Sequence, residues 1–266
     1  MSYYIILGLS FLLVAAIIRG NMHKRKQGYV PPISPAKAHQ LLLENVRYYA
    51  RLNPDEQAEF RTRAKDFLEH VIISPVGDVK ITTLDRIYVA AAAIIPIFRH
   101  KGWAYNHLNE VLIYPGNFSK DFEQDPESAN VMGMVGDGAM HRMMVLSIGA
   151  LRAGFEQAGR GNTGIHEFVH LLDKADGAVD GVPDALLPEE LARPWAAYMH
   201  RAIQDIQSGK SDINPYGATS EAEFFAVVSE YFFQRPEAMA EKHPELMDLL
   251  TQIYKEPEAV TQEDAA

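Results

Sequence analysis

The first residues of the chain form an apolar run that is followed directly by basic side chains. Residues 3–18 contain no charge, and basic residues come after them at 19 and at 24–26. The run is slightly shorter than the roughly 17 to 25 residues of an ordinary membrane-spanning helix, but Tyr3, Tyr4 and Arg19 can lie in the interfacial layer and extend it. The pattern predicts an uncleaved membrane-anchor helix at residues 1–20.

A cleaved signal peptide and a buried helix of a soluble domain are the alternatives to an anchor. A signal peptide carries its basic residues before the apolar core, whereas nothing basic precedes Tyr3. Because Lys and Arg are enriched on the cytoplasmic side of membrane helices, the basic residues after the run predict a cytoplasmic location for the rest of the chain. Residues 21–33 are then a basic juxtamembrane linker that ends in an extended stretch containing two prolines.

Beyond the linker, apolar residues mostly recur at helical spacing, which predicts one largely helical domain at residues 34–255. The first predicted helix runs to residue 52, and the third reaches Pro96, which kinks or ends it. The polar, acidic residues 256–266 are expected to form a flexible tail. Three helix starts are indicated by capping signatures: Ser34 with Pro35, Asn53 with Pro54 and Glu56, and Thr83.

Two short apolar runs in the middle of the chain predict strands at residues 111–114 and 143–148. A glycine-rich region at 133–138 lies between them and is expected to be a turn. The second strand has two possible positions: the edge of the sheet, where an extended peptide could add to it, and the interior, which its apolar sequence favours equally. Helices and strands together predict an α+β fold with a small sheet.

Composition narrows the classes of function. The chain has 266 residues, 47% of them hydrophobic and 23% charged, as in ordinary globular proteins. Its formal net charge of -10 argues against holding nucleic acid by phosphate neutralisation, so no nucleic-acid partner is expected. The absence of cysteine excludes thiolate zinc sites, iron–sulfur clusters and thiol nucleophiles. Any metal must therefore be held by histidine, carboxylate or backbone oxygen.

The sequence GIHEFVHLLDK at residues 164–174 contains His166, Glu167 and His170 in the HExxH arrangement. Side chains four residues apart project from the same face of a helix, so the two imidazoles can bind one metal ion. Glu167 is the adjacent residue and can take a proton from a water on that ion. The alternative is a chance match on an ordinary helix. The remaining residues of this helix are apolar and predict burial, where histidines without a partner are costly, so a zinc site is favoured.

A catalytic zinc ion needs a third protein ligand and an open position. Asp176 has the spacing of one zinc-peptidase class, but that class requires a glycine where this chain has Asp173. Glu223 and Glu230 lie seven residues apart on a predicted apolar helix and share one face. The residues alone favour Glu223 and leave Glu230 and Asp176 open.

These acidic residues also have structural interpretations. Ser220 and Glu223 form an S-x-x-E capping box that could simply start the helix. Glu230 could be a carboxylate that orients a ligating histidine. Three further carboxylates could orient a histidine or cap the loop after the histidine helix: Asp173, Asp176 and Asp180.

Two segments closely resemble the Mlc titration factor A (MtfA) family of zinc-dependent peptidases, whose site is related to the catalytic domain of anthrax lethal factor. They are GNTGIHEFVHLLDKADGAVDG at 161–181 and YGATSEAEFFAVVSEYFFQRP at 216–236, and weaker similarity extends over residues 40–255. The resemblance implies a zincin-like domain with a Zn²⁺ cofactor. It implies that Glu167 is the general base and that three residues ligate the zinc: His166, His170 and Glu223.

The resemblance also brings in Tyr216, which corresponds to a tyrosine near the metal in the family. Its phenol could donate a hydrogen bond to the oxyanion of the reaction intermediate. The alternative is a turn tyrosine, after Pro215, whose hydroxyl contact is incidental.

The function predicted from these features is a gluzincin-type peptidase, with HExxH and a downstream glutamate, that hydrolyses peptide bonds through a zinc-activated water. The expected partners are a peptide or protein substrate and, through residues 1–20, a membrane. A single-pass protein of the bacterial inner membrane with a cytoplasmic catalytic domain is therefore expected. Known relatives include a protein that titrates a sugar-responsive transcriptional repressor. The alternative is thus a regulatory protein that sequesters such a repressor and whose zinc site is secondary.

Overall fold

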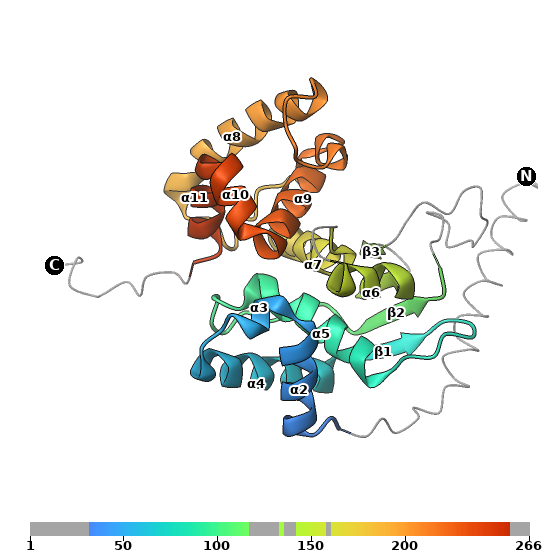
Figure 1. Cartoon of the computed structure of the whole chain (residues 1–266). Coiled ribbons are helices and arrows are strands. Elements are labelled where there is room, and N and C mark those ends of the chain that lie inside the picture. The colour runs from blue at the N-terminus through green and yellow to red at the C-terminus, as the bar shows by residue number, and fades with distance from the viewer. Residues whose placement is uncertain (1–31, 117–132, 136–141, 158–160, 256–266) are drawn as a thin grey trace, which may run out of the picture. The chain divides into compact units, whose positions relative to one another are not determined.

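The structure, a computed structural model, describes residues 32–116, 133–135, 142–157 and 161–255 (Figure 1). The chain divides into two units after Ser34. The predicted anchor at 1–20, nearly all of the linker at 21–33 and the tail at 256–266 lie outside the described residues, so all three stay predictions. Within the described ranges, no helix has the length and hydropathy that a membrane crossing requires.

Helices make up most of the described residues, as the sequence predicts. They are α2 (Pro35–Asn45), α3 (Arg47–Ala50), α4 (Pro54–His70), α5 (Thr83–Ile97), α6 (Ile148–Glu156), α7 (Thr163–Asp173), α8 (Glu189–Gln207), α9 (Glu221–Gln234), α10 (Pro236–Lys242) and α11 (Pro244–Ile253). Short 3₁₀ helices are η2 (Lys174–Asp176), after α7, and η3 (Pro215–Ala218), before α9. The strands are β1 (Ile72–Pro75), β2 (Glu110–Tyr114), β3 (Gly133–Val135) and β4 (Met143–Ser147). The described residues therefore have the predicted α+β fold class.

The strands form one sheet in the order β1-β2-β4-β3. β1, β2 and β4 are parallel, and β3 runs antiparallel to β4 with Val135 opposite Met144. β4 therefore lies inside the sheet, so the edge position considered for it is wrong and the interior position is confirmed. Burial explains this, because Met144, Val145 and Leu146 are all at most 1% exposed.

Local capping explains where several elements start. Asn53 and Glu56 form a capping box at α4, as predicted. A second box, formed by Thr82 and Asp85, starts α5 one residue earlier than expected, and Pro96 lies in the last turn of that helix. β4 ends at Ser147 rather than residue 148, because the Ser147 side chain accepts a hydrogen bond from the Ala150 N–H and caps α6.

Three other features differ from the sequence prediction. The first helix is interrupted at Val46, whose backbone is extended with φ −121°. The region expected as a turn at 133–138 contains β3, because pairing with β4 outweighs the turn preference of its glycine. β1 was not predicted. Its signal is weak, since the strand is only four residues long and just two of them, Ile73 and Ser74, are buried.

α5 is the central helix of the core, and its residues from Ile87 to Ile97 are all buried. It packs against α4, α6 and α7. At its first turn the buried carboxylate of Asp85 accepts two hydrogen bonds from the Arg152 guanidinium, at 2.7 and 2.9 Å. Burial would raise the pKa of Asp85, but the bonds from Arg152 and Thr82 outweigh burial and lower it. This ion pair fixes α6 against α5.

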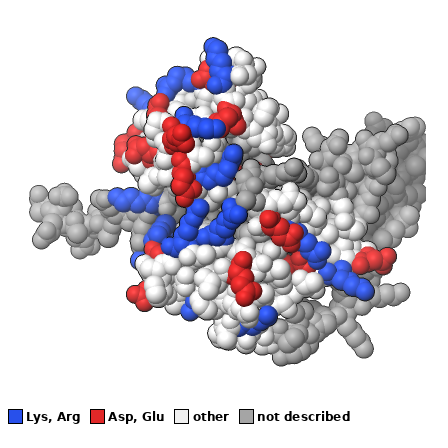
Figure 2. Space-filling model, in the orientation of Figure 1, with Lys and Arg blue, Asp and Glu red and all other residues white. Residues whose placement is uncertain are grey.

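Acidic and basic side chains are interspersed on the face drawn in Figure 2, and Lys and Arg gather across its middle. The net charge of -10 is therefore not spread as a uniform acidic field over this face.

Candidate metal centre

The HExxH residues lie on α7, which packs against α5, α9, β3 and β4. Asn162 caps the helix: its side chain accepts a hydrogen bond from the Ile165 N–H and donates one to the Gly154 carbonyl. Asn162 is fully buried, and His166 and Glu167 are only 8% and 5% exposed. The helix therefore presents two imidazoles and a carboxylate in a largely desolvated position.

The downstream glutamates lie on α9, the helix that packs against α7. Ser220 caps α9 by accepting a hydrogen bond from the Glu223 N–H. The Glu223 side chain does not complete the capping box, because its carboxylate instead contacts His166 at 2.9 Å. The interpretation of Ser220 and Glu223 as a simple cap is therefore wrong for the glutamate side chain.

The structure brings His166, His170 and Glu223 together, with one ligand atom of each within 4.8 Å of the others. The two Nε2 atoms lie 3.1 Å apart, and Glu223 Oε2 lies 2.9 Å from Nε2 of His166 and 3.4 Å from that of His170. Ligand atoms about 2.0 to 2.1 Å from a tetrahedral zinc ion are roughly 3.3 Å apart. The three donor atoms therefore fit one face of a zinc coordination tetrahedron.

The hydrogen bond on the other nitrogen of His166 supports this fit. Nδ1 of His166 lies 2.6 Å from Glu230 Oε1, an oxygen that can only accept while the carboxylate is ionised. With Nδ1 as the donor of this hydrogen bond, the Nε2 lone pair of the neutral ring faces the centre formed with His170 and Glu223. A lone pair beside another imidazole nitrogen and a carboxylate oxygen needs a cation or a proton between them.

The electrostatics show the same preference for positive charge. Burial would lower the pKa of His166, but its hydrogen bonds to Glu223 and Glu230 outweigh burial and raise it to about 10. For Glu223, an acid, burial would instead raise the pKa, but the hydrogen bonds from His166 and His170 outweigh burial and hold the pKa well below its usual range. The cluster therefore stabilises a bound cation by the same contacts that hold a proton.

Glu167 lies beside the metal cluster without belonging to it. It is almost fully buried, and burial raises the pKa of its carboxyl group. A raised pKa brings a carboxylate closer to the neutral range in which a general base is effective.

Tyr216 lies in η3, where its N–H donates to the Asn214 side chain. Its hydroxyl donates to Glu223 Oε1 at 3.2 Å, and its ring centroid is 6.0 Å from that of His166. Burial and the neighbouring Glu223 raise the pKa of Tyr216 to about 12, so the phenol keeps its proton at neutral pH. The hydroxyl is thus a donor at the rim of the centre, since the residue is 51% exposed.

The aspartates that follow α7 lie outside the cluster. Asp176 and Asp180 are exposed, and their side chains accept hydrogen bonds from backbone N–H groups two residues ahead. Asp173 is fully buried and accepts from the Gly181 N–H, and burial raises its pKa to about 6. All three side chains thus stabilise the loop after α7, as in the capping interpretation, and Asp176 is not brought to the histidines.

Asn162 and Gly161 belong to the centre but were not singled out in the sequence. Glu230 accepts a second hydrogen bond from the Asn162 N–H, at 2.5 Å, in addition to the one from His166. A Cβ atom at Gly161 would lie 2.4 Å from Oε2 of the same Glu230, so a larger residue there would displace this carboxylate. The signal that could have found them is the Gly-Asn-Thr-Gly sequence directly before the motif, an Asn cap flanked by small residues.

Replacing Glu230 with glutamine is expected to lower zinc affinity by about 10- to 100-fold. The amide has one acceptor oxygen, so it cannot serve both the His166 ring and the Asn162 N–H. Competition with a chromophoric zinc chelator measures the change, and Glu241→Gln, an exposed change on α10, is the control. Unchanged affinity in the Glu230 variant would contradict its role in orienting His166.

Comparisons with known proteins identify the family of the chain. A family model described as glucose-regulated metallo-peptidase M90 matches residues 21–255. The chain is 31% identical to a Mlc titration factor A of Escherichia fergusonii over 219 residues, covering 78% of this chain and 82% of the relative. It is 28% identical to the Mlc titration factor A of Pectobacterium atrosepticum, with coverage of 80% and 83%. An uncharacterised protein of Synechocystis sp. is 28% identical, with coverage of 91% and 92%. The chain therefore belongs to the Mlc titration factor A family, within the glucose-regulated metallopeptidases M90.

Proposed function

We propose that this protein is a zinc-dependent peptidase in which His166, His170 and Glu223 hold the metal. The observation that carries the proposal is the convergence of these three donor atoms from α7 and α9, with the buried Glu167 adjacent. Two nitrogens and one carboxylate oxygen form the ligand set of a hydrolytic zinc site with an open position. Membership of a metallopeptidase family supports the same chemistry.

A zinc ion held there would supply Lewis acidity, which polarises the scissile carbonyl and makes water a better nucleophile at neutral pH. Glu167 then accepts a proton from the attacking water and passes the same proton to the nitrogen of the leaving amine. The C–N bond breaks with this transfer, and Glu167 returns to its ionised form. The raised pKa of Glu167 suits both transfers. Glu230 holds the His166 ring in place throughout, through its bond to Nδ1.

The edge of the sheet is a suitable place for an extended substrate. In the described part of the chain, β3 is an edge strand of the sheet and pairs along one side with β4. It also packs against α7, the helix that carries Glu167. A peptide that paired with the other side of β3 would run along this helix. This moves the strand-addition hypothesis from β4, where the sequence had put it, to β3.

The proposal is tested by peptide hydrolysis and its dependence on the metal. The zinc-loaded chain is expected to cleave members of a mixed peptide library, as seen by mass spectrometry of the products. Dialysis against a chelator should abolish cleavage, and one equivalent of zinc should restore it, because the proposed reaction depends on the Lewis acidity of the metal. A zinc-loaded, folded chain that cleaves no peptide would sink the proposal.

Replacing Tyr216 with phenylalanine is expected to lower kcat for peptide hydrolysis by about 10- to 100-fold, with a smaller change in KM. The phenol is the proposed donor to the oxyanion, and phenylalanine keeps the ring while removing the hydroxyl. Zinc content should stay within the error of the wild type, since Tyr216 contributes no ligand atom to the cluster. An unchanged kcat would indicate that the bond from Tyr216 to Glu223 is incidental.

The names of the relatives support a second candidate function, binding of a transcriptional repressor. In that case the zinc site would be secondary. The variant Glu167→Gln distinguishes the two candidate functions, because it removes the base and leaves the protein surface unchanged. A binding protein would keep its full cellular effect in this variant, whereas a peptidase would lose it.

A further inference from the structure

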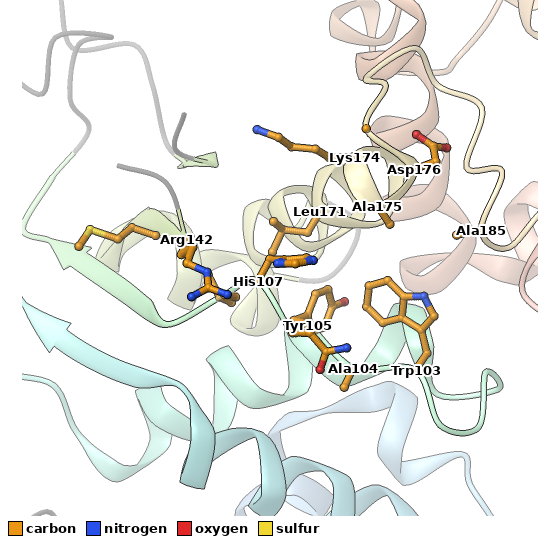
Figure 3. A pocket seen from close by; sticks show the side chains of 14 residues that line it. Trp103, Ala104, Tyr105, His107, Arg142, Leu171, Lys174, Ala175, Asp176 and Ala185 are labelled. Carbon is orange, nitrogen blue, oxygen red and sulfur yellow. The ribbon is translucent and has the colours of Figure 1, made fainter. Parts of the chain in front are cut away.

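A cavity of about 600 Å³ lies at the C-terminal end of α7, between that helix, the loop at 103–108 and the start of β4. In Figure 3 the side chains of Leu171, His107 and Arg142 line one side of it, and Trp103 lies at the other. No residue of the metal cluster lines this cavity. It is therefore a separate binding space on the same helix.

The helix places this cavity next to the substrate path. Leu171 lies on α7 four residues after Glu167, so it projects within about 40° of the direction of Glu167, and Lys174 follows as the C-cap of the helix, at the start of η2. At 1.5 Å per residue they lie roughly 6 and 10 Å further along the helix axis. An extended peptide advances about 3.3 Å per residue, so these distances correspond to two or three residues from the bond at Glu167.

The lining of the cavity suits an anionic group with an apolar stem. Arg142 and Lys174 contribute cationic side chains, and His107 contributes an imidazole. Among the described residues of the lining, the one carboxylate is that of Asp176, which accepts a hydrogen bond from the Ala178 N–H and lies on the opposite side of the cavity from Arg142 (Figure 3). Leu171 and Trp103 offer apolar surface, and Trp103 is held edge-on against the Tyr105 ring, at 4.9 Å between centroids.

Arg142 is held in a backbone conformation that non-glycine residues rarely adopt. Its φ is +71°, in the left-handed region. Its carbonyl accepts hydrogen bonds from the N–H groups of Asn109 and Glu110, at 2.8 and 3.4 Å, which fix it at the start of β2. Because the backbone of Arg142 is held in place, its side chain starts from a fixed point in the structure. Strained backbone positions of this kind cluster at functional sites.

We propose that this cavity is a substrate subsite that accepts an acidic side chain two or three residues from the scissile bond, with Arg142 and Lys174 as its specificity-determining residues. The inference rests on the proposed peptidase function. The carboxylate of a substrate glutamate would bind one of these two cationic groups, and its methylene groups would pack on Leu171.

The test begins with binding, so that it does not depend on turnover. Two fluorescent peptides that differ only by Glu or Gln at one position are titrated against the zinc-loaded Glu167→Gln chain, and the position is moved along the peptide one residue at a time. At one position the Glu peptide is expected to bind about 5- to 30-fold more tightly, and in a peptide that the wild-type chain cleaves this position lies two or three residues from the scissile bond. A ratio near one at every position would overturn the subsite.

Variants then assign the preference to the cavity. Arg142→Asn keeps a residue that tolerates the left-handed backbone, and together with Lys174→Gln it is expected to reduce the Glu-to-Gln ratio to within about twofold of one. Lys174→Glu should favour a Lys peptide instead. Lys210→Gln, an exposed change in the loop after α8, is the control and should keep the wild-type ratio. A ratio that survives in the double variant would overturn the assignment.

Failure of the subsite and failure of the proposed function give different results. If the wild-type chain cleaves peptides without any preference for acidic residues, the subsite is wrong and the peptidase function stands. If no peptide is cleaved but the binding ratio is present and is lost in the double variant, the cavity binds acidic peptides and the hydrolytic function is wrong.

Discussion

Replacing Glu167 with glutamine is expected to lower kcat for peptide hydrolysis by about 100- to 10,000-fold, the usual contribution of a general base. The amide is nearly the same size as the carboxyl group but cannot take up the proton of the attacking water. Zinc content should be unchanged, because Glu167 lies outside the group formed by His166, His170 and Glu223. Steady-state kinetics on one cleaved peptide and metal analysis of the same sample measure both quantities.

The stability of the Glu167 variant separates lost chemistry from lost folding. Burial raises the pKa of Glu167, so its charged form is destabilised in the folded chain. A neutral amide removes that cost, and the midpoint of thermal unfolding is expected to stay the same or to rise. An active variant would show that another group is the base. If the Glu167→Gln variant is inactive because it has lost zinc or has unfolded, its inactivity does not support Glu167 as the base. The variant Glu167→Asp, which keeps a carboxylate, would then have to retain zinc and show partial activity.

Replacing Glu223 with alanine is expected to weaken zinc binding by at least about 1,000-fold, since it removes one of three ligands whose joint binding free energy is on the order of 10 kcal/mol. His166 and His170 would be left as a two-nitrogen site. Hydrolysis should fall to background at stoichiometric zinc and recover in part with excess zinc. Chelator competition and activity over a range of zinc concentrations measure the two effects.

Glu221→Ala is the matched control for the Glu223 variant. It lies two residues earlier on the first turn of α9, and its side chain is exposed. Both variants lose one negative charge near the helix N-terminus, so they share the loss of the favourable dipole interaction. Of these two glutamates, only Glu223 contacts the histidines. Equal zinc affinity in the two variants would contradict Glu223 as a ligand.

Features set by nearby residues could be predicted from the sequence. The capping box of Asn53 and Glu56 marked the start of α4 correctly, because all its hydrogen bonds lie within one turn. The spacing of His166 and His170 likewise brought their nitrogens together, since the helix itself sets their geometry.

Features that depend on distant segments were predicted less well. β3 and the interior position of β4 follow from pairing between strands, which short apolar runs do not specify. The contact of Glu223 with His166 joins residues 57 positions apart, so spacing alone left Glu223, Glu230 and Asp176 open. The residues alone favoured Glu223 only weakly, and the resemblance to a family strengthened its assignment as the third ligand. The bond from Asn162 to Glu230 spans 68 positions and had no signal of its own beyond the small residues around it.

The central claim is that two imidazoles and the Glu223 carboxylate hold one zinc ion. Zinc K-edge X-ray absorption on the purified full chain tests it most directly. The account predicts about one zinc per chain, with only nitrogen and oxygen neighbours at about 2.0 to 2.1 Å and the outer-shell scattering of two histidine rings. The Glu223→Ala chain should lose this signal. A folded chain that binds no zinc after reconstitution, or a spectrum that Glu223→Ala leaves unchanged, would contradict the account.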